Sequence, residues 1–204
     1  MDFVNPGRES LQALLQQHSA SDPAEARDLE RMREAVRSLQ EPFSRGQPQA
    51  HFTGSAVIVD PQGARVCLIH HGKLHRWLQP GGHCEPEDDG SLEAAALREA
   101  REETGLNVRL HPGAPRPLDV DAHLIPARGS EPDHHHLDIR FLLVAEDPQI
   151  LTHDPQESHG ARWLGWEEAL ALSTEPALLR LFRKARAIAE RGEWANATGG
   201  VGPT

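Results

Sequence analysis

The sequence predicts an α/β fold of the α+β type, in which helices cover a mixed β-sheet. Three observations support this prediction: helical patterns at both ends of the chain, β-branched apolar segments between them, and a further helix among those segments. A length of 204 residues suits one compact domain with an appendage. Because helices come before, between and after the strands, we expect an α/β/α sandwich.

Composition and charge narrow the range of partners. The formal net charge of −10 argues against general affinity for nucleic acid polymers or anionic membranes, although it leaves room for a small phosphorylated ligand. No segment approaches the roughly 18 apolar residues of a membrane span. The first ten residues lack the basic and apolar regions of a signal peptide. We therefore expect a cytoplasmic protein.

Residues 1–45 are predicted to form an N-terminal helical extension. The pair Asp22–Pro23 is typical of a helix start. Apolar residues recur at helical spacing in two segments: Leu11, Leu14 and Leu15 in the first, and Leu29, Met32, Val36 and Leu39 in the second. This pattern indicates a helical hairpin that packs on the main domain or on a partner chain, as in a homodimer. The main domain is expected at 46–192, followed by a flexible tail at 193–204.

The strands are expected in four segments. Residues 51–60 and 64–71 are apolar and β-branched and are joined by Pro-Gln-Gly, which predicts a β-hairpin. Residues 117–125 and 134–146 are predicted to be further strands. In the last segment, Leu137, Ile139, Phe141 and Leu143 form one apolar face, while the other face begins polar and becomes apolar. A short helix and a longer one are expected within 165–192.

One helix carries an unusual cluster of charge. Glu99, Glu102 and Glu103 lie on the same face near the end of a predicted helix that Gly105 would terminate. Like charges at this spacing repel, and the helix dipole disfavours anions there. One interpretation is a solvated face that Arg98 and Arg101 partly neutralise. The other is a divalent cation such as Mg²⁺ or Mn²⁺, which prefers clustered carboxylates and backbone carbonyls. The nearby Gly81–Gly82 pair favours the second interpretation, because backbone carbonyls there could reach the same place.

The segment REAREETGL, residues 98–106, resembles the end of the Nudix box, and PGGHCEP, residues 80–86, resembles its glycine loop. The loop is two residues longer than the usual box, and its acidic position is Asp88. The resemblance covers about residues 52–172. It implies a Nudix-like sandwich and a hydrolase that uses Mg²⁺ or Mn²⁺ to cleave a pyrophosphate bond in a nucleoside di- or triphosphate or a nucleoside-diphosphate derivative.

The resemblance also implies roles for individual residues. Glu99, Glu102 and Glu103 would hold the metal together with the Gly82 carbonyl, and Arg98 would orient Glu99. The family's general base varies and often lies in a later loop. Glu157, six residues before Trp163, is the leading candidate outside the box, and its alternative is an exposed loop acid.

Further residues are candidates for a role in binding. His83, His136 and Arg140 are candidates for substrate contact, against the alternative of a solvated sheet face. Zinc is not predicted, because consecutive histidines on a strand point to opposite faces and no Cys/His set has ligand spacing. The alternative function is a non-catalytic Nudix-fold sensor. The presence of all three box glutamates favours an enzyme.

Overall fold

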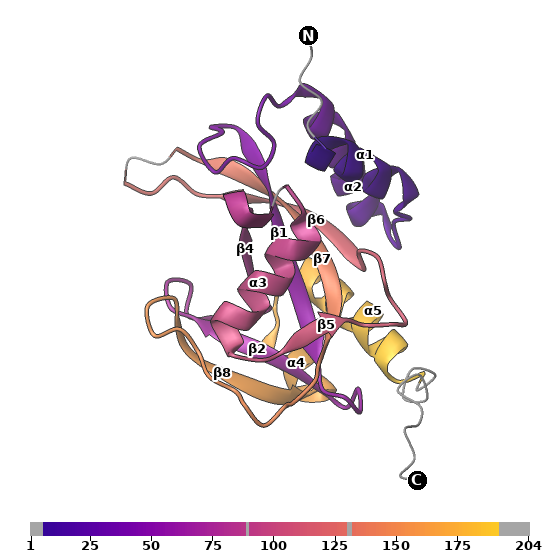
Figure 1. Cartoon of the computed structure of the whole chain (residues 1–204), viewed down its shortest axis with the longest axis vertical. Helices are drawn as coiled ribbons and strands as arrows, with labels where there is room; N and C mark the ends of the chain where they lie inside the picture. Colours follow the sequence, from indigo (N-terminus) through magenta and orange to yellow (C-terminus); the bar gives the residue numbers. More distant parts are fainter. Residues whose placement is uncertain (1–5, 89, 130–131, 192–204) are drawn as a thin grey trace.

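The computed structural model describes residues 6–88, 90–129 and 132–191, and the predicted tail lies outside these ranges. Within them, an eight-stranded mixed sheet has helices packed on both of its faces, as Figure 1 shows. The predicted sandwich of helices around a mixed sheet, preceded by N-terminal helices, is confirmed. No helix in the described ranges is both long and apolar enough to cross a bilayer.

Two parallel strands form the centre of the sheet. β1 (Ala50–Val59) pairs with β7 (His134–Ala145) along its whole length. β1 also pairs antiparallel with β2 (Arg65–His71), so the predicted hairpin is confirmed. β3 (Arg76–Leu78) and β8 (Ser158–Gly165) extend the sheet from the two edges of β2.

Each central strand changes its outer neighbour midway. The first half of β1 pairs with β4 (Gly81–His83), whereas its second half pairs with β2. In the same way, β7 pairs first with β6 (Asp119–Ile125) and then with β5 (Val108–Leu110). The sheet is therefore split on both sides of its central pair, and the polar halves of β1 and β7 lie side by side at one end.

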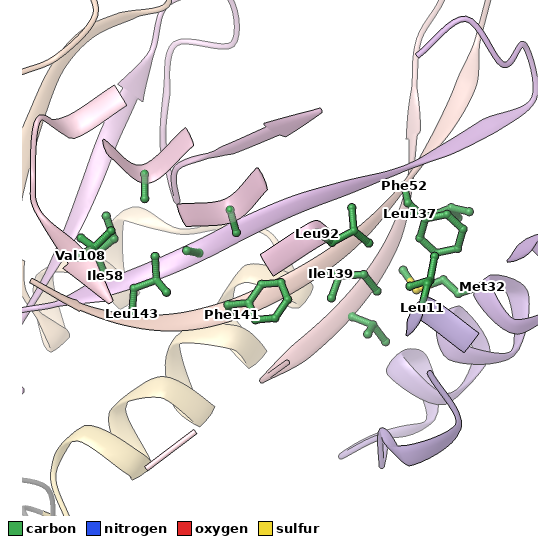
Figure 2. Packing of buried hydrophobic residues seen from close by; sticks show 14 of the residues in the cluster. Leu11, Met32, Phe52, Ile58, Leu92, Val108, Leu137, Ile139, Phe141 and Leu143 are labelled. Carbon is green, nitrogen blue, oxygen red and sulfur yellow. The ribbon is translucent and has the colours of Figure 1, made fainter. Parts of the chain in front are cut away.

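Strand alternation directs the apolar side chains into two cores. On one face, Phe52 and Ile58 of β1 pack with Phe141 of β7 and with α3 (Leu92–Thr104), as Figure 2 shows. On the other face, Val57 and Val59 pack beneath α4 (Trp166–Leu172) and α5 (Pro176–Ala189). Because both faces are covered, nearly all side chains of β1 are buried, as expected for a central strand.

The N-terminal hairpin consists of α1 (Pro6–Gln17) and α2 (Pro23–Ser38). The Asp22 carboxylate accepts hydrogen bonds from the first backbone amides of α2, which confirms the predicted N-cap. Leu11 and Met32 join the same apolar cluster as Phe52 and Leu137 (Figure 2). The hairpin therefore packs on the main domain of its own chain. The boundary near residue 45 stays a prediction.

A buried carboxylate connects this hairpin to the last helix. Glu25 is fully buried, and its Oε1 lies 2.5 Å from Lys184 Nζ of α5 and 2.8 Å from His18 Nε2. Ser21 donates hydrogen bonds to the other oxygen. Burial alone would raise the pKa of Glu25, but these partners outweigh it and hold the pKa well below its usual range.

We expect Glu25→Gln to lower the free energy of unfolding by about 3 kcal/mol at neutral pH, because it breaks a buried charged network. Since the folded-state pKa is depressed, this stabilisation is present above the unfolded-state pKa of about 4.5 and declines as the pH falls below it. Denaturant titrations at several pH values measure the difference. Glu30→Gln is the control, since its side chain on the same helix is 68% exposed. Equal stability of the two variants at neutral pH would contradict the prediction.

Candidate active site

The acidic helix is positioned by its caps and by close packing on β1. Ser91 Oγ accepts a hydrogen bond from the Ala94 amide, and Gly105 ends α3 in the left-handed conformation with φ 69°. At Gly54 of β1 a side chain would collide with the Leu92 carbonyl, so α3 lies directly on the strand. The predicted helix and its end at Gly105 are confirmed, and the three glutamates project from a rigid element.

β4 approaches the same helix face. A side chain at Gly82 would collide with the Glu99 carboxylate, which explains the glycine at this position. The Gly81 amide donates a hydrogen bond to Glu103 Oε2 at 2.8 Å. The glycine pair and the glutamates, which are about 20 residues apart in the chain, therefore form one site.

Arg98 links four groups around this site. Its Nη1 lies 3.0 Å from Glu99 Oε1 and 2.9 Å from Glu102 Oε2, while Nη2 donates to the His83 carbonyl at 2.8 Å. The buried Asp88 carboxylate, on the short 3₁₀ turn Pro86–Asp88, also accepts from Arg98 at 2.9 Å. Asp88 therefore anchors the lengthened loop to the helix.

Burial changes the acidity of two glutamates. Glu103 is only 5% exposed, and burial is the main cause that raises its pKa to about 8, with smaller contributions from Glu99, Glu157 and Asp154. Burial also raises the pKa of Glu99, although Arg98 opposes this. Buried carboxylates that lie close together favour protonation unless a cation is present. The donors are all oxygens, which fits Mg²⁺ or Mn²⁺.

Glu157 reaches the glutamate site from the loop before β8. Its backbone carbonyl accepts a hydrogen bond from the Gly72 amide at 2.8 Å, which holds the loop before β8 against the loop after β2. The side chain of Glu157 is exposed and, with Glu99, Glu102 and Glu103, lines a cavity of about 680 Å³. The structure thus brings the acid predicted outside the box to the same cavity as the box glutamates.

A second cavity, of about 790 Å³, adjoins the first. His83 and His136 line both cavities, as do the basic residues Arg45 and Lys73, while Arg128 lines only the second. The two histidines predicted to contact substrate therefore lie where the acidic and basic cavities meet. Sequence reasoning missed His51, Arg45 and Lys73, because each comes from a different segment with no recognisable local pattern.

The structure corrects the prediction that Arg140 contacts the substrate. It lines neither cavity and is only 4% exposed. Its guanidinium instead pairs with Asp138 at 2.9 Å and Asp121 at 2.8 Å, beneath the sheet surface. The polar face of β7 was correctly predicted, but Arg140 is buried beside Asp119, its register partner on β6. We therefore do not retain Arg140 as a substrate contact.

The split mixed sheet and the glutamate helix facing a glycine turn are the features of a Nudix-type domain. A NUDIX domain model matches residues 51–185. The chain belongs to the NUDIX family, and the prediction of a Nudix hydrolase is confirmed at the level of the family.

The individual relatives share little sequence identity with this chain. The chain is 28% identical over 132 residues to the m7GpppN-mRNA hydrolase NUDT17 of Homo sapiens, a match that covers 59% of this chain and only 40% of that protein. A NUDIX-family hydrolase from Clostridium perfringens is 24% identical, with a TM-score of 0.50 over 69% of this chain and 97% of the other. An Ap4A hydrolase from C. elegans is 20% identical, with a TM-score of 0.48 over 69% and 98%. The C. perfringens similarity supports the fold alone.

Proposed function

We propose that this protein is a metal-dependent hydrolase that cleaves a pyrophosphate bond in a nucleoside di- or triphosphate or a nucleoside-diphosphate derivative. The observation that carries the proposal is the convergence of Glu99, Glu102, Glu103 and Glu157 on one cavity beside Gly82. Three carboxylates that repel one another on one helix face are best explained by a ligand that needs their charge.

The box glutamates would hold Mg²⁺ or Mn²⁺, with the Gly82 carbonyl as a further ligand. When bound, such an ion neutralises the pyrophosphate and lowers the pKa of the attacking water. Arg98 holds the carboxylate of Glu99 in place through the contact at 3.0 Å. Glu157, which lines the same cavity, would accept the proton of the attacking water as general base.

The two joined cavities support a substrate with groups on both sides of the scissile bond. Each has the size of a typical small-molecule site. Arg45, Lys73 and Arg128 supply positive charge for a second phosphate, and His83 and His136 lie between the halves. We further propose that the substrate is a small molecule rather than a nucleic acid polymer, and that the enzyme acts in the cytoplasm.

The decisive experiment is a substrate panel with the purified protein and either metal. It includes nucleoside di- and triphosphates, ADP-ribose, NADH and dinucleoside polyphosphates. A capped RNA is added because the human relative is named for cap hydrolysis. Product identification shows which phosphorus is attacked. Tight binding of a panel member without cleavage would instead support a sensor.

Hydrolysis is expected to require Mg²⁺ or Mn²⁺ and to increase toward alkaline pH. The attacking water must lose a proton, and Glu103 must also be ionised before it can bind a cation. Because its metal-free pKa is raised to about 8, protons compete with the metal below that pH. Initial rates from pH 6 to 10, at several metal concentrations, measure this competition. Undiminished activity in excess chelator would refute the metal requirement.

A further inference from the structure

Three histidines from distant segments meet beside the glutamate site. His51 near the start of β1 is the register partner of His136 on β7, and His83 ends β4, which pairs with β1 two residues further along. The ring centroids form a nearly equilateral triangle with sides of 4.8 Å, 5.0 Å and 5.0 Å. One ring nitrogen from each lies within 4.8 Å of the others.

Of the three histidines, His51 has the greatest lack of hydrogen-bond partners. It is 1% exposed, and neither ring nitrogen has a hydrogen-bond partner among the described residues. The Gln47 backbone is near enough to raise its pKa slightly but lies outside hydrogen-bonding geometry. A buried polar group without a partner costs about 1–3 kcal/mol, so such groups are rare unless an ion or water completes them.

Zinc is bound by neutral imidazoles, whose ring nitrogens offer lone pairs. Burial, followed by the charge of neighbouring basic groups, lowers the pKa of His51 to about 4 and that of His136 to about 2, so both rings are neutral at physiological pH. The cluster is not one of charged histidines, because three protonated rings this close together would repel one another.

We propose that His51, His83 and His136 bind a zinc ion, at a site separate from the glutamates. Neutral imidazole nitrogens suit zinc, whereas Mg²⁺ and Mn²⁺ prefer the oxygens of the carboxylate cluster. Nitrogens around a tetrahedral zinc lie about 3.3 Å apart, so side-chain rotations that draw the three rings inward complete the site.

Three protein ligands leave a fourth position for water or for a donor atom of a bound ligand. This position faces open space, because all three histidines line the basic cavity and two of them also line the acidic one. The proposal does not depend on the hydrolase function, since zinc binding can be measured without any substrate.

The test is zinc retention in the presence of excess Mg²⁺, which occupies the carboxylate site. The full-length protein is stripped with a chelator, reloaded with Zn²⁺ and dialysed against Mg²⁺, and its zinc content is measured by mass spectrometry. We expect about one zinc ion per chain and a higher melting temperature than in the stripped protein. In the Co²⁺-substituted protein, the absorption spectrum should be that of four-coordinate cobalt.

His136→Gln and His83→Gln should each weaken zinc affinity at least about 100-fold and abolish the rise in melting temperature. Both side chains are only partly buried, so these variants are preferable to changes at His51 in the core. Circular dichroism verifies their folding. His159→Gln is the matched control, since His159 stacks on His75 at 5.4 Å, away from the three ligands, and should retain zinc.

Three results would overturn the proposal. The wild-type protein could lose its zinc to Mg²⁺, which would leave no separate site. Glu102→Gln could lose zinc while His136→Gln retains it, which would place the ion among the carboxylates. His159→Gln could lose as much as His136→Gln, which would indicate general surface binding.

Discussion

Glu102→Gln is expected to lower kcat at least about 100-fold while the protein stays folded. The substitution removes a negative charge that would help to hold the metal, and metal electrostatics carry much of this chemistry. Its structural cost should be small, because the side chain is 58% exposed and its ion pair with Arg98 lies near the surface. Without metal, the free energy of unfolding should hold or rise slightly, because repulsion from Glu99 and Glu103 is relieved.

Steady-state kinetics and thermal unfolding of the metal-free protein measure the two effects separately. Glu93→Gln is the control, because Glu93 lies on the same helix but lines neither cavity. It should retain full kcat. If Glu102→Gln instead unfolds, the salt bridge with Arg98 is the essential role of Glu102, and the metal-ligand assignment loses its support.

Glu157→Gln is expected to reduce kcat by about 10²–10⁴-fold with little change in KM. The base acts on the water mainly in the transition state, so its loss affects turnover more than substrate binding. The exposed side chain lines the glutamate cavity, and its charge contributes to the raised pKa values of Glu99 and Glu103 after the larger effect of burial. This proximity is what general-base chemistry requires.

Glu168→Gln provides the comparison. Glu168 lies on α4, pairs with Arg162 at 2.9 Å and lines neither cavity, so its variant should keep normal kinetics. Measuring both variants side by side separates a local effect from a general loss of negative charge. An unaffected Glu157→Gln enzyme would assign the base to Glu99 or Glu102.

The elements that depend on local periodicity were predictable. Alternation in residues 134–146 identified β7, including the change of its second face from polar to apolar. Helical spacing placed Glu99, Glu102 and Glu103 on one face, and Gly105 marked the end of α3. These features follow from 2-residue and 3.6-residue repeats and from one glycine conformation, all of which are encoded within a few neighbouring residues.

The burial of individual polar residues was not predictable in this way. Arg140 occupies a polar position of a strand and could equally have faced the cleft. It is buried instead, and its charge is paired with Asp119 and Asp121, both from β6. Likewise, the apolar stripes of α1 and α2 predicted a packing face but did not distinguish the main domain from a second chain. The two helices pack on their own chain because their apolar residues join a cluster with Phe52 and Leu137, which are distant in sequence.

The sequence by itself determined the class of chemistry, because the carboxylates that carry it lie within five residues of one helix and the glycine turn lies just before it. The tertiary structure alone decided the histidine site. His51, His83 and His136 come from three strands, and alternation along any single strand argued against a metal. Only the parallel register of β1 with β7, and the pairing of β4 with the first half of β1, bring their nitrogens together. Strand pairing is a long-range choice that local patterns do not encode.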